Sequence, residues 1–157
     1  MSEATPNEVP GPTWTPDQIQ ASCQGNPHPL ALKGIAFFNA HKYFEAHEEL
    51  ELAWREERGA IRDVYRGILQ VGLGYYHILR GNFPGARKMF MRCRGWLAPY
   101  PPACRGIDVE TLRQDFTRAE AELLRLGPEH IGEFNQILMR PVLFTYTDSE
   151  PLENIDG

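Results

Sequence analysis

The chain has 157 residues, which is the size of one domain with a substantial hydrophobic core. Its hydrophobic content of 42% and charged content of 24% are typical of a globular protein, and its net charge of −5 argues against a dedicated nucleic-acid-binding protein. No apolar run approaches the roughly 20 residues of a membrane-spanning helix, so no membrane partner is expected.

The cysteines bear on the cellular compartment. Cys23, Cys93 and Cys104 are odd in number and form no C-x-x-C pair, which argues against a disulfide framework and against a structural zinc site. Residues 1–14 lack the basic and apolar regions of a secretory signal peptide. We therefore expect free thiols and a cytoplasmic location.

The chain begins with a proline-rich, polar stretch, residues 1–14, which is expected to be a disordered tail. Thr15, Pro16 and Gln18 then occupy the N-cap, first-turn and capping-box positions of a helix start. This helix should be short, because glycine and prolines at residues 25–29 break the chain again.

The remaining chain has helical periodicity. Five main helices are expected, over residues 29–41, 43–58, 60–80, 84 to about 97, and 108–126. Asp108 is a plausible N-cap of the last helix and Gly127 its stop, and a short helical turn is expected shortly afterwards. Few strand signals favour an all-α fold, a single helical bundle over residues 15–140 with an extended C-terminal arm over 141–157.

The helix expected over residues 43–58 carries polar side chains on two faces. Each helical residue advances the side-chain direction by about 100°. Glu45 and Glu49 therefore lie on the face that meets water, whereas His47 and Glu51 lie one turn apart within the apolar stripe, beside Trp54. A carboxylate in such a stripe needs a partner, because burying a lone charge costs several kcal/mol.

The next helix carries a second polar stripe. Within about 60° of Gln70 lie Asp63, Gly67, Gly74, His77 and Gly81, with Arg66 at one side. A glycine costs a helix about 1 kcal/mol relative to alanine, so three at seven-residue spacing predict close approach of another backbone or of a ligand.

A short turn near Gly59 makes these two helices antiparallel neighbours, so their polar stripes should face each other. The predicted result is a buried polar seam between the two helices. Asp63 is a further candidate member, and His77 is expected at the mouth of the pocket that this seam would form. Its main members are His47, Glu51, Arg66 and Gln70.

The seam residues and their order resemble the domain-of-unknown-function 309 family of bacteria, archaea and plastids. The similarity runs from Phe37 to Phe116, and its hallmark is H-x-x-x-E-x-x-W, here His47, Glu51 and Trp54. The resemblance implies an all-helical fold and a motif suggested to bind a metal. The biochemical function of the family is not established.

The leading hypothesis is a metal or small-ligand site in this seam. His47, Glu51 and His77 are the candidate metal ligands, because histidine and glutamate one turn apart can share a divalent ion. Such an ion with an open position would make hydrolysis available. Trp54, Arg66 and Gln70 are the candidate ligand-binding residues.

A structural network is the alternative to a binding seam. In it, Glu51 pairs with Arg66 or accepts a hydrogen bond from His47, and Gln70 satisfies what remains. Cys93 is expected only to pack in the core.

A basic segment supports another function, an interaction module for RNA, an anion or a protein. Between Val64 and Ile107 there is no acidic residue, but there are seven basic ones: Arg66, Arg80, Arg87, Lys88, Arg92, Arg94 and Arg105. The alternative is a basic face that docks against the acidic helix over residues 108–126. The oligomeric state and the substrate are not indicated by any pattern in the chain.

Overall fold

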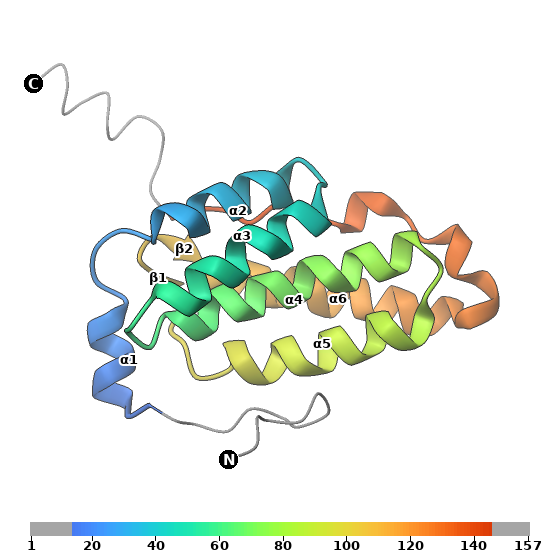
Figure 1. Ribbon diagram of the computed structural model, residues 1–157. Coiled ribbons are helices and arrows are strands. Elements are labelled where there is room, and N and C mark those ends of the chain that lie inside the picture. Colours follow the sequence, from blue (N-terminus) through green and yellow to red (C-terminus); the bar gives the residue numbers. More distant parts are fainter. Residues whose placement is uncertain (1–13, 146–157) are drawn as a thin grey trace, which may run out of the picture.

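The computed structural model describes residues 14–145 as a helical bundle (Figure 1). Its α-helices are α1 (Pro16–Ser22), α2 (Pro29–Asn39), α3 (Tyr43–Glu56), α4 (Arg62–Leu79), α5 (Phe83–Leu97) and α6 (Val109–Leu126). Two short 3-10 helices follow, η1 (Pro128–Glu133) and η2 (Gln136–Leu138), and two-residue strands β1 (Ala103–Cys104) and β2 (Ile107–Asp108) precede α6. The all-α prediction is confirmed, and each of the five main helices lies within about two residues of its expected bounds.

The predicted helix ends rest on side-chain caps. The Thr15 hydroxyl accepts from the Gln18 backbone N–H at 3.1 Å, and the Gln18 side chain accepts from the Thr15 N–H at 2.8 Å, completing the capping box. Asp108 accepts from the Thr111 backbone N–H at 2.9 Å at the start of α6. Gly127 ends α6 with a φ of 71°, a conformation that glycine adopts without strain.

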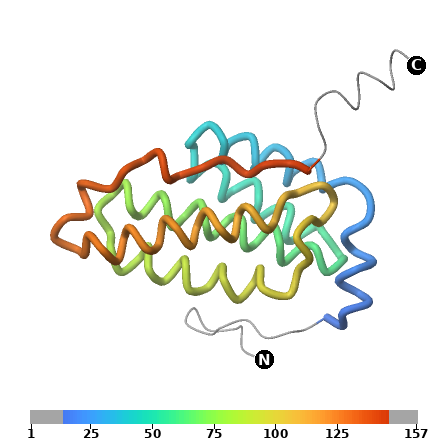
Figure 2. The backbone as a smooth tube through the Cα atoms, turned by 180° about the vertical axis from the view of Figure 1, so that it is seen from behind, coloured from blue at the N-terminus to red at the C-terminus, as the bar shows by residue number. Residues whose placement is uncertain are grey.

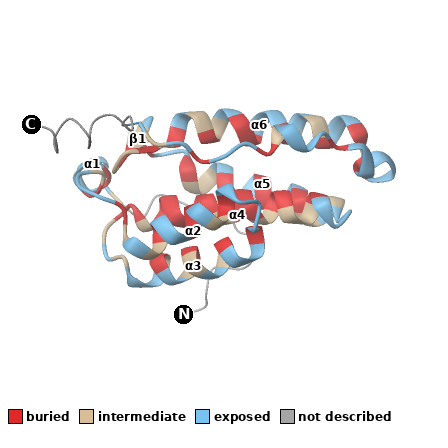
Figure 3. Cartoon of the chain, turned by 90° about the horizontal axis from the view of Figure 1, so that it is seen from above, coloured by how far each residue is buried: buried red, intermediate tan, exposed pale blue. Residues whose placement is uncertain are grey.

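Helix α4 lies at the centre of the bundle, between α3 and α5, and most of its surface is buried (Figure 3). A Cβ added to Gly67 would come within 2.5 Å of the Leu97 side chain, and one added to Gly74 within 2.7 Å of Phe90. The close approach predicted for the glycines is present at these two, but α5 side chains make it and not a backbone or a ligand, and Gly81 has no neighbour within 4 Å.

Residues 141–145 are extended and run back along the bundle (Figure 2). The Asn39 side chain holds them to α2, accepting from the Val142 N–H at 2.8 Å and donating to its carbonyl at 3.0 Å. Phe144 also forms an isolated β-bridge with Ile107 of the β1–β2 hairpin. The sequence predicted neither the hairpin nor this bridge.

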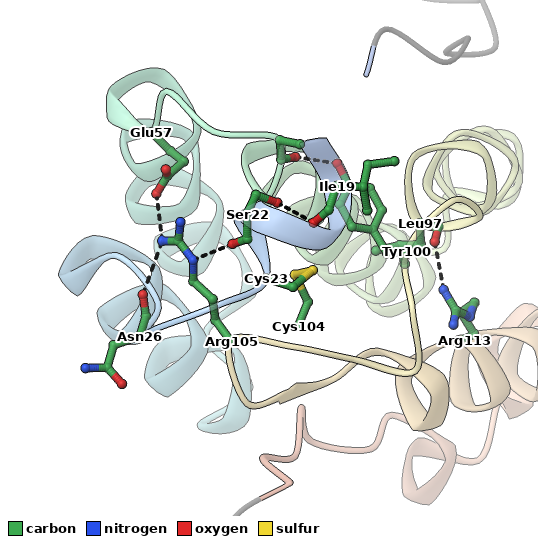
Figure 4. Close-up of a disulfide and its surroundings, with 11 residues drawn as sticks. Ile19, Ser22, Cys23, Asn26, Glu57, Leu97, Tyr100, Cys104, Arg105 and Arg113 are labelled. Atoms are coloured by element: carbon green, nitrogen blue, oxygen red, sulfur yellow. Dashed lines mark hydrogen bonds and ion pairs between the residues drawn. A yellow bond between two sulfur atoms is a disulfide. The ribbon is translucent and has the colours of Figure 1, made fainter. Parts of the chain in front are cut away.

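The expectation of three free thiols is wrong, because Cys23 and Cys104 form a disulfide (Figure 4). The two residues are 81 positions apart, so their meeting depends on how α1 docks beside the hairpin and not on any local spacing. Cys93 is the free cysteine, and it is buried, as expected. The cytoplasmic location rested on reduced cysteines and stays a prediction without that support.

Beside the disulfide lies what we call the Arg105 cluster: Ser22, Asn26, Glu57 and Arg105 (Figure 4). Arg105 donates to the Ser22 carbonyl at 2.7 Å and to the Asn26 carbonyl at 3.2 Å, and pairs with Glu57 at 3.2 Å. Its backbone N–H also donates to the Cys23 carbonyl at 2.8 Å. The cluster and the disulfide together fasten the α1–α2 connection to the hairpin.

None of the helices within residues 14–145 is long and apolar enough to cross a membrane. Residues 1–13 of the expected tail, and residues 146–157 of the expected arm, lie outside the described part of the chain.

Candidate functional site

A cavity of about 210 Å³ opens between α3, α4 and α5, and we call it the seam cavity. It brings together five residues that the sequence assigned to one site: His47, Glu51, Trp54, Arg66 and Gln70. Its other lining residues are Leu69, Leu73, Met89 and Arg92. The antiparallel packing of α3 against α4 therefore aligns the two polar stripes as predicted.

Glu51 lies at the rim of the cavity and has two partners. One carboxylate oxygen is 3.3 Å from Nε2 of His47, and the other accepts from Arg55 at 2.7 Å. The side chains of His47 and Glu51 are 27% and 37% exposed, so this pair is half-buried and not enclosed as expected. The predicted His47 contact is present, whereas Arg55 takes the position that the structural alternative gave to Arg66.

Arg66 is held by aromatic rings. Its guanidinium carbon lies 4.5 Å from the centre of the Trp54 ring and 5.1 Å from that of Trp96. Among the described residues, no carboxylate forms an ion pair with Arg66. Burial lowers the pKa of Arg66, and Asp63 and Glu51 partly oppose that shift. The group still stays cationic, because arginine is not deprotonated in proteins.

Gln70 is the most enclosed polar residue of the cavity lining. It is 5% exposed, and its Oε1 has no hydrogen-bond partner. The Nε of Arg66, one turn away on the same helix, also lacks one. Nδ1 of His47 and Nε1 of Trp54, two further lining residues, lack partners as well. Buried polar atoms are paired in the great majority of cases, so this group of unpaired atoms at one cavity calls for an explanation.

Asp63 does not line the cavity. The indole N–H of Trp14 donates to its carboxylate at 3.0 Å, and Asp63 is 8% exposed. Burial raises the pKa of Asp63, and the hydrogen bond from Trp14 partly opposes that shift. Trp14 was assigned to the disordered tail, which is wrong for this residue, and the partner of Asp63 was therefore missed.

His77 is not among the lining residues either. Its Nδ1 lies 3.3 Å from the side-chain nitrogen of Asn82, at the end of α4. Burial, and then the charge of Arg80, lower the pKa of His77. The three proposed metal ligands are therefore not brought to one point.

The donor set of the cavity does not fit a tight zinc site. Within residues 14–145, no three His, Cys, Asp or Glu side chains form a group that could hold a metal ion. His47 and Glu51 offer two donors where such a site uses three or four. Both Glu51 oxygens already contact His47 or Arg55.

Sequence reasoning missed the contribution of α5 to this cavity. Met89 and Arg92 lie one turn apart on α5 and close its third side. The signal that pointed to them was the pair of glycines on α4, which let α5 approach closely. Trp96, which contacts Arg66, carried no signal beyond its place on the apolar side of α5.

The basic segment is only partly engaged with α6. Arg94 forms an ion pair with Glu120, as the docking alternative requires, whereas Arg87 and Lys88 are exposed. These side chains border an open groove of about 500 Å³ on α5, with Phe83, Pro84 and Met91.

Comparison with known proteins places part of the chain in a family. No curated protein and no solved structure gives a match. Residues 31–89 match the family model described as "Domain of unknown function (DUF309)". This segment runs from α2 into α5 and includes every lining residue of the seam cavity except Arg92. The resemblance to this family is therefore confirmed over residues 31–89, and that segment supplies most of the cavity lining.

Proposed function

We propose that this protein binds a small ligand and that the seam cavity is the binding site. The observation that carries the proposal is Gln70, a 5% exposed residue in the lining of a cavity with polar groups from three helices, whose buried amide oxygen has no hydrogen-bond partner. Small-molecule sites combine apolar walls with polar groups that fix orientation, and here Leu69, Leu73 and Met89 supply the first while Arg66 and Gln70 supply the second.

A purely structural role for the seam is harder to reconcile with these contacts. A structural network would pair its buried groups, because each unpaired one costs about 1–3 kcal/mol. Leucine or methionine at position 70 would fill the same volume at no such cost. An unpaired Gln70 is explained if a ligand supplies the missing hydrogen bond.

The proposal is tested by blocking the cavity. Ligand-observed NMR would screen a mixture of neutral, anionic and cationic compounds of up to about 12 heavy atoms. Leu73→Trp places a large side chain in the lining, and Leu79→Trp makes the same change at a 45% exposed position of the same helix. We expect compounds that bind the wild type and Leu79→Trp but not Leu73→Trp. Equal binding to all three proteins, or none to any, would refute the proposal.

A divalent metal ion at His47 and Glu51 is a separate proposal with less support. Only two donors are present, and the cations Arg66 and Arg92 line the same cavity and oppose a second positive charge. Titration calorimetry with Zn²⁺ and Mn²⁺ tests it. Binding that is lost in His47→Ala and in Glu51→Gln would support a metal site, and unchanged weak binding in both variants would exclude it.

The α5 groove supports the second candidate function, an interaction module. Its two exposed cations beside the 47% exposed Met91 suit an anionic partner. Arg87→Glu combined with Lys88→Glu should abolish salt-sensitive binding to single-stranded RNA or to a co-purifying acidic protein. No change in either would exclude this function.

A further inference from the structure

We infer that the ligand of the seam cavity is a small organic carboxylate, bound through Arg66, with an apolar body about the size of one ring. The inference rests on the proposed function and names its ligand class. Three features of the cavity support it: the state of Arg66, the distribution of charge, and the size and polarity of the walls.

Arg66 is prepared to bind an anion. Its guanidinium carbon lies 4.5 Å and 5.1 Å from the centres of the Trp54 and Trp96 rings, which restricts its rotation, and such cation–ring contacts do not occupy the N–H donors of the guanidinium edge. The edge includes Nε, which has no partner. A carboxylate matches that edge with two parallel hydrogen bonds, and no carboxylate of the described residues pairs with it.

The charge of the lining favours a negative ligand group. Arg66 and Arg92 are its two arginines, and Glu51 is its one carboxylate. Glu51 is turned toward His47 and Arg55, and Arg55 does not line the cavity. A cationic ligand would be repelled by both guanidinium groups. An anionic ligand would meet only the carboxylate of Glu51, which already pairs with Arg55.

The walls define the rest of the ligand. Leu69, Leu73 and Met89 form an apolar side that an inorganic anion would leave without contacts. A cavity of 150 Å³ is known to accept benzene. The seam cavity, at about 210 Å³, therefore has room for one ring and a carboxylate group.

Benzoate is the probe that tests the inference, and benzamide is its neutral match in shape. Calorimetry in phosphate-free buffer should show benzoate binding the wild type at least tenfold more tightly than benzamide, with inorganic phosphate weaker than benzoate. This comparison needs no variant, so misfolding cannot confuse it.

Variants then test the role of Arg66. Arg66→Gln should weaken benzoate binding at least tenfold, and Arg66→Lys, which keeps the charge without the planar edge, should weaken it less. Arg58→Gln removes an exposed cation that lines neither the seam cavity nor the α5 groove and should change affinity by less than twofold. Thermal unfolding checks that each variant is folded.

Each contrary outcome has a distinct meaning. Equal binding of benzoate and benzamide overturns the carboxylate inference but leaves a small-ligand site. Phosphate binding more tightly than benzoate overturns the organic ligand class. Unchanged benzoate affinity in Arg66→Gln overturns the role of Arg66. If no compound of the screen is lost in Leu73→Trp, the proposed function itself fails.

Discussion

Arg105 and Arg66 are both partly buried arginines, but their surroundings differ. Arg105 donates to two backbone carbonyls and pairs with Glu57, so each of these contacts joins one segment of the chain to another. Arg66 contacts two indole rings and pairs with no carboxylate of the described residues. The first arginine is held by three polar partners from its own protein, whereas the Nε of the second has no partner.

This difference separates a structural cluster from a binding site. A cluster that only stabilises a fold has no reason to leave donors or acceptors unpaired. A site that binds a ligand must keep some of them available, and the fold then loses the stability they would have contributed. The Arg105 cluster and the seam cavity should therefore respond to mutation in opposite ways.

The largest expected effect is on the Arg105 side of the molecule. Replacing Cys23 and Cys104 with serine removes a cross-link between residues 81 positions apart. We expect the free energy of unfolding in urea to fall by about 4 kcal/mol, as for a loop of this length. Benzoate binding at the distant seam cavity should persist below the unfolding transition. A reductant should lower the stability of the wild type but not of the double variant; if it lowers neither, the cysteines are not bonded.

The two arginines provide the direct contrast. Arg105→Ala leaves Glu57, whose side chain is 13% exposed, without its ion-pair partner and with only the Gly59 backbone N–H, so we expect a loss of about 3 kcal/mol. Arg66→Gln breaks no ion pair, and we expect a loss of less than about 1 kcal/mol, from its ring contacts alone. Urea denaturation of both variants measures the difference. Equal losses would remove the distinction between the two regions.

Gln70→Leu should show the cost of keeping the site. The change removes a buried oxygen that has no partner, so we expect the protein to gain about 1 kcal/mol of stability while benzoate binding weakens. Gln114→Leu on α6 is the control, because Gln114 is exposed and its stability effect should stay within about 0.5 kcal/mol. A destabilised Gln70→Leu protein would mean that the amide is structurally required.

The smallest effect concerns Asp63, which lies near both Arg66 and Trp14. Because burial raises the pKa of Asp63 above its usual range, the folded protein holds that proton more tightly than the unfolded chain does. The stability contributed by Asp63 is therefore fully present below the unfolded pKa and is lost as the pH rises through the folded pKa. Asp63→Asn cannot ionise and should raise the melting temperature at pH 7, with the gain disappearing near about pH 3. A gain that grows toward acidic pH would show that the pKa is lowered instead.

The fold could be predicted from the sequence because its signals are local. Periodicity places the helices, and caps such as Thr15 and Asp108 place their ends. The β1–β2 hairpin and the disulfide depend on long-range docking, and two-residue strands have no pattern of their own. Local spacing cannot show that Cys23 meets Cys104.

The candidate site was predictable to the extent that two adjacent helices build it. The short turn before α4 fixes the alignment of His47, Glu51 and Trp54 with Arg66 and Gln70. The side chains from α5 depend on how a third helix packs, and no local pattern in the chain specifies the register of that packing. Asp63 and His77 lie on the polar stripe of α4, as predicted, but this stripe extends beyond both ends of the cavity, so neither residue lines it.

The ring contacts of Arg66 have an optical consequence. The chain has three tryptophans. Trp54 and Trp96 contact Arg66, and Trp14 donates to Asp63, whose carboxylate acts electrostatically on that same arginine. Any molecule that binds to Arg66 changes the electric field at these indoles. The intrinsic fluorescence of the unlabelled protein should therefore report on occupancy of the seam cavity, and a change in emission maximum would follow ligand binding in real time.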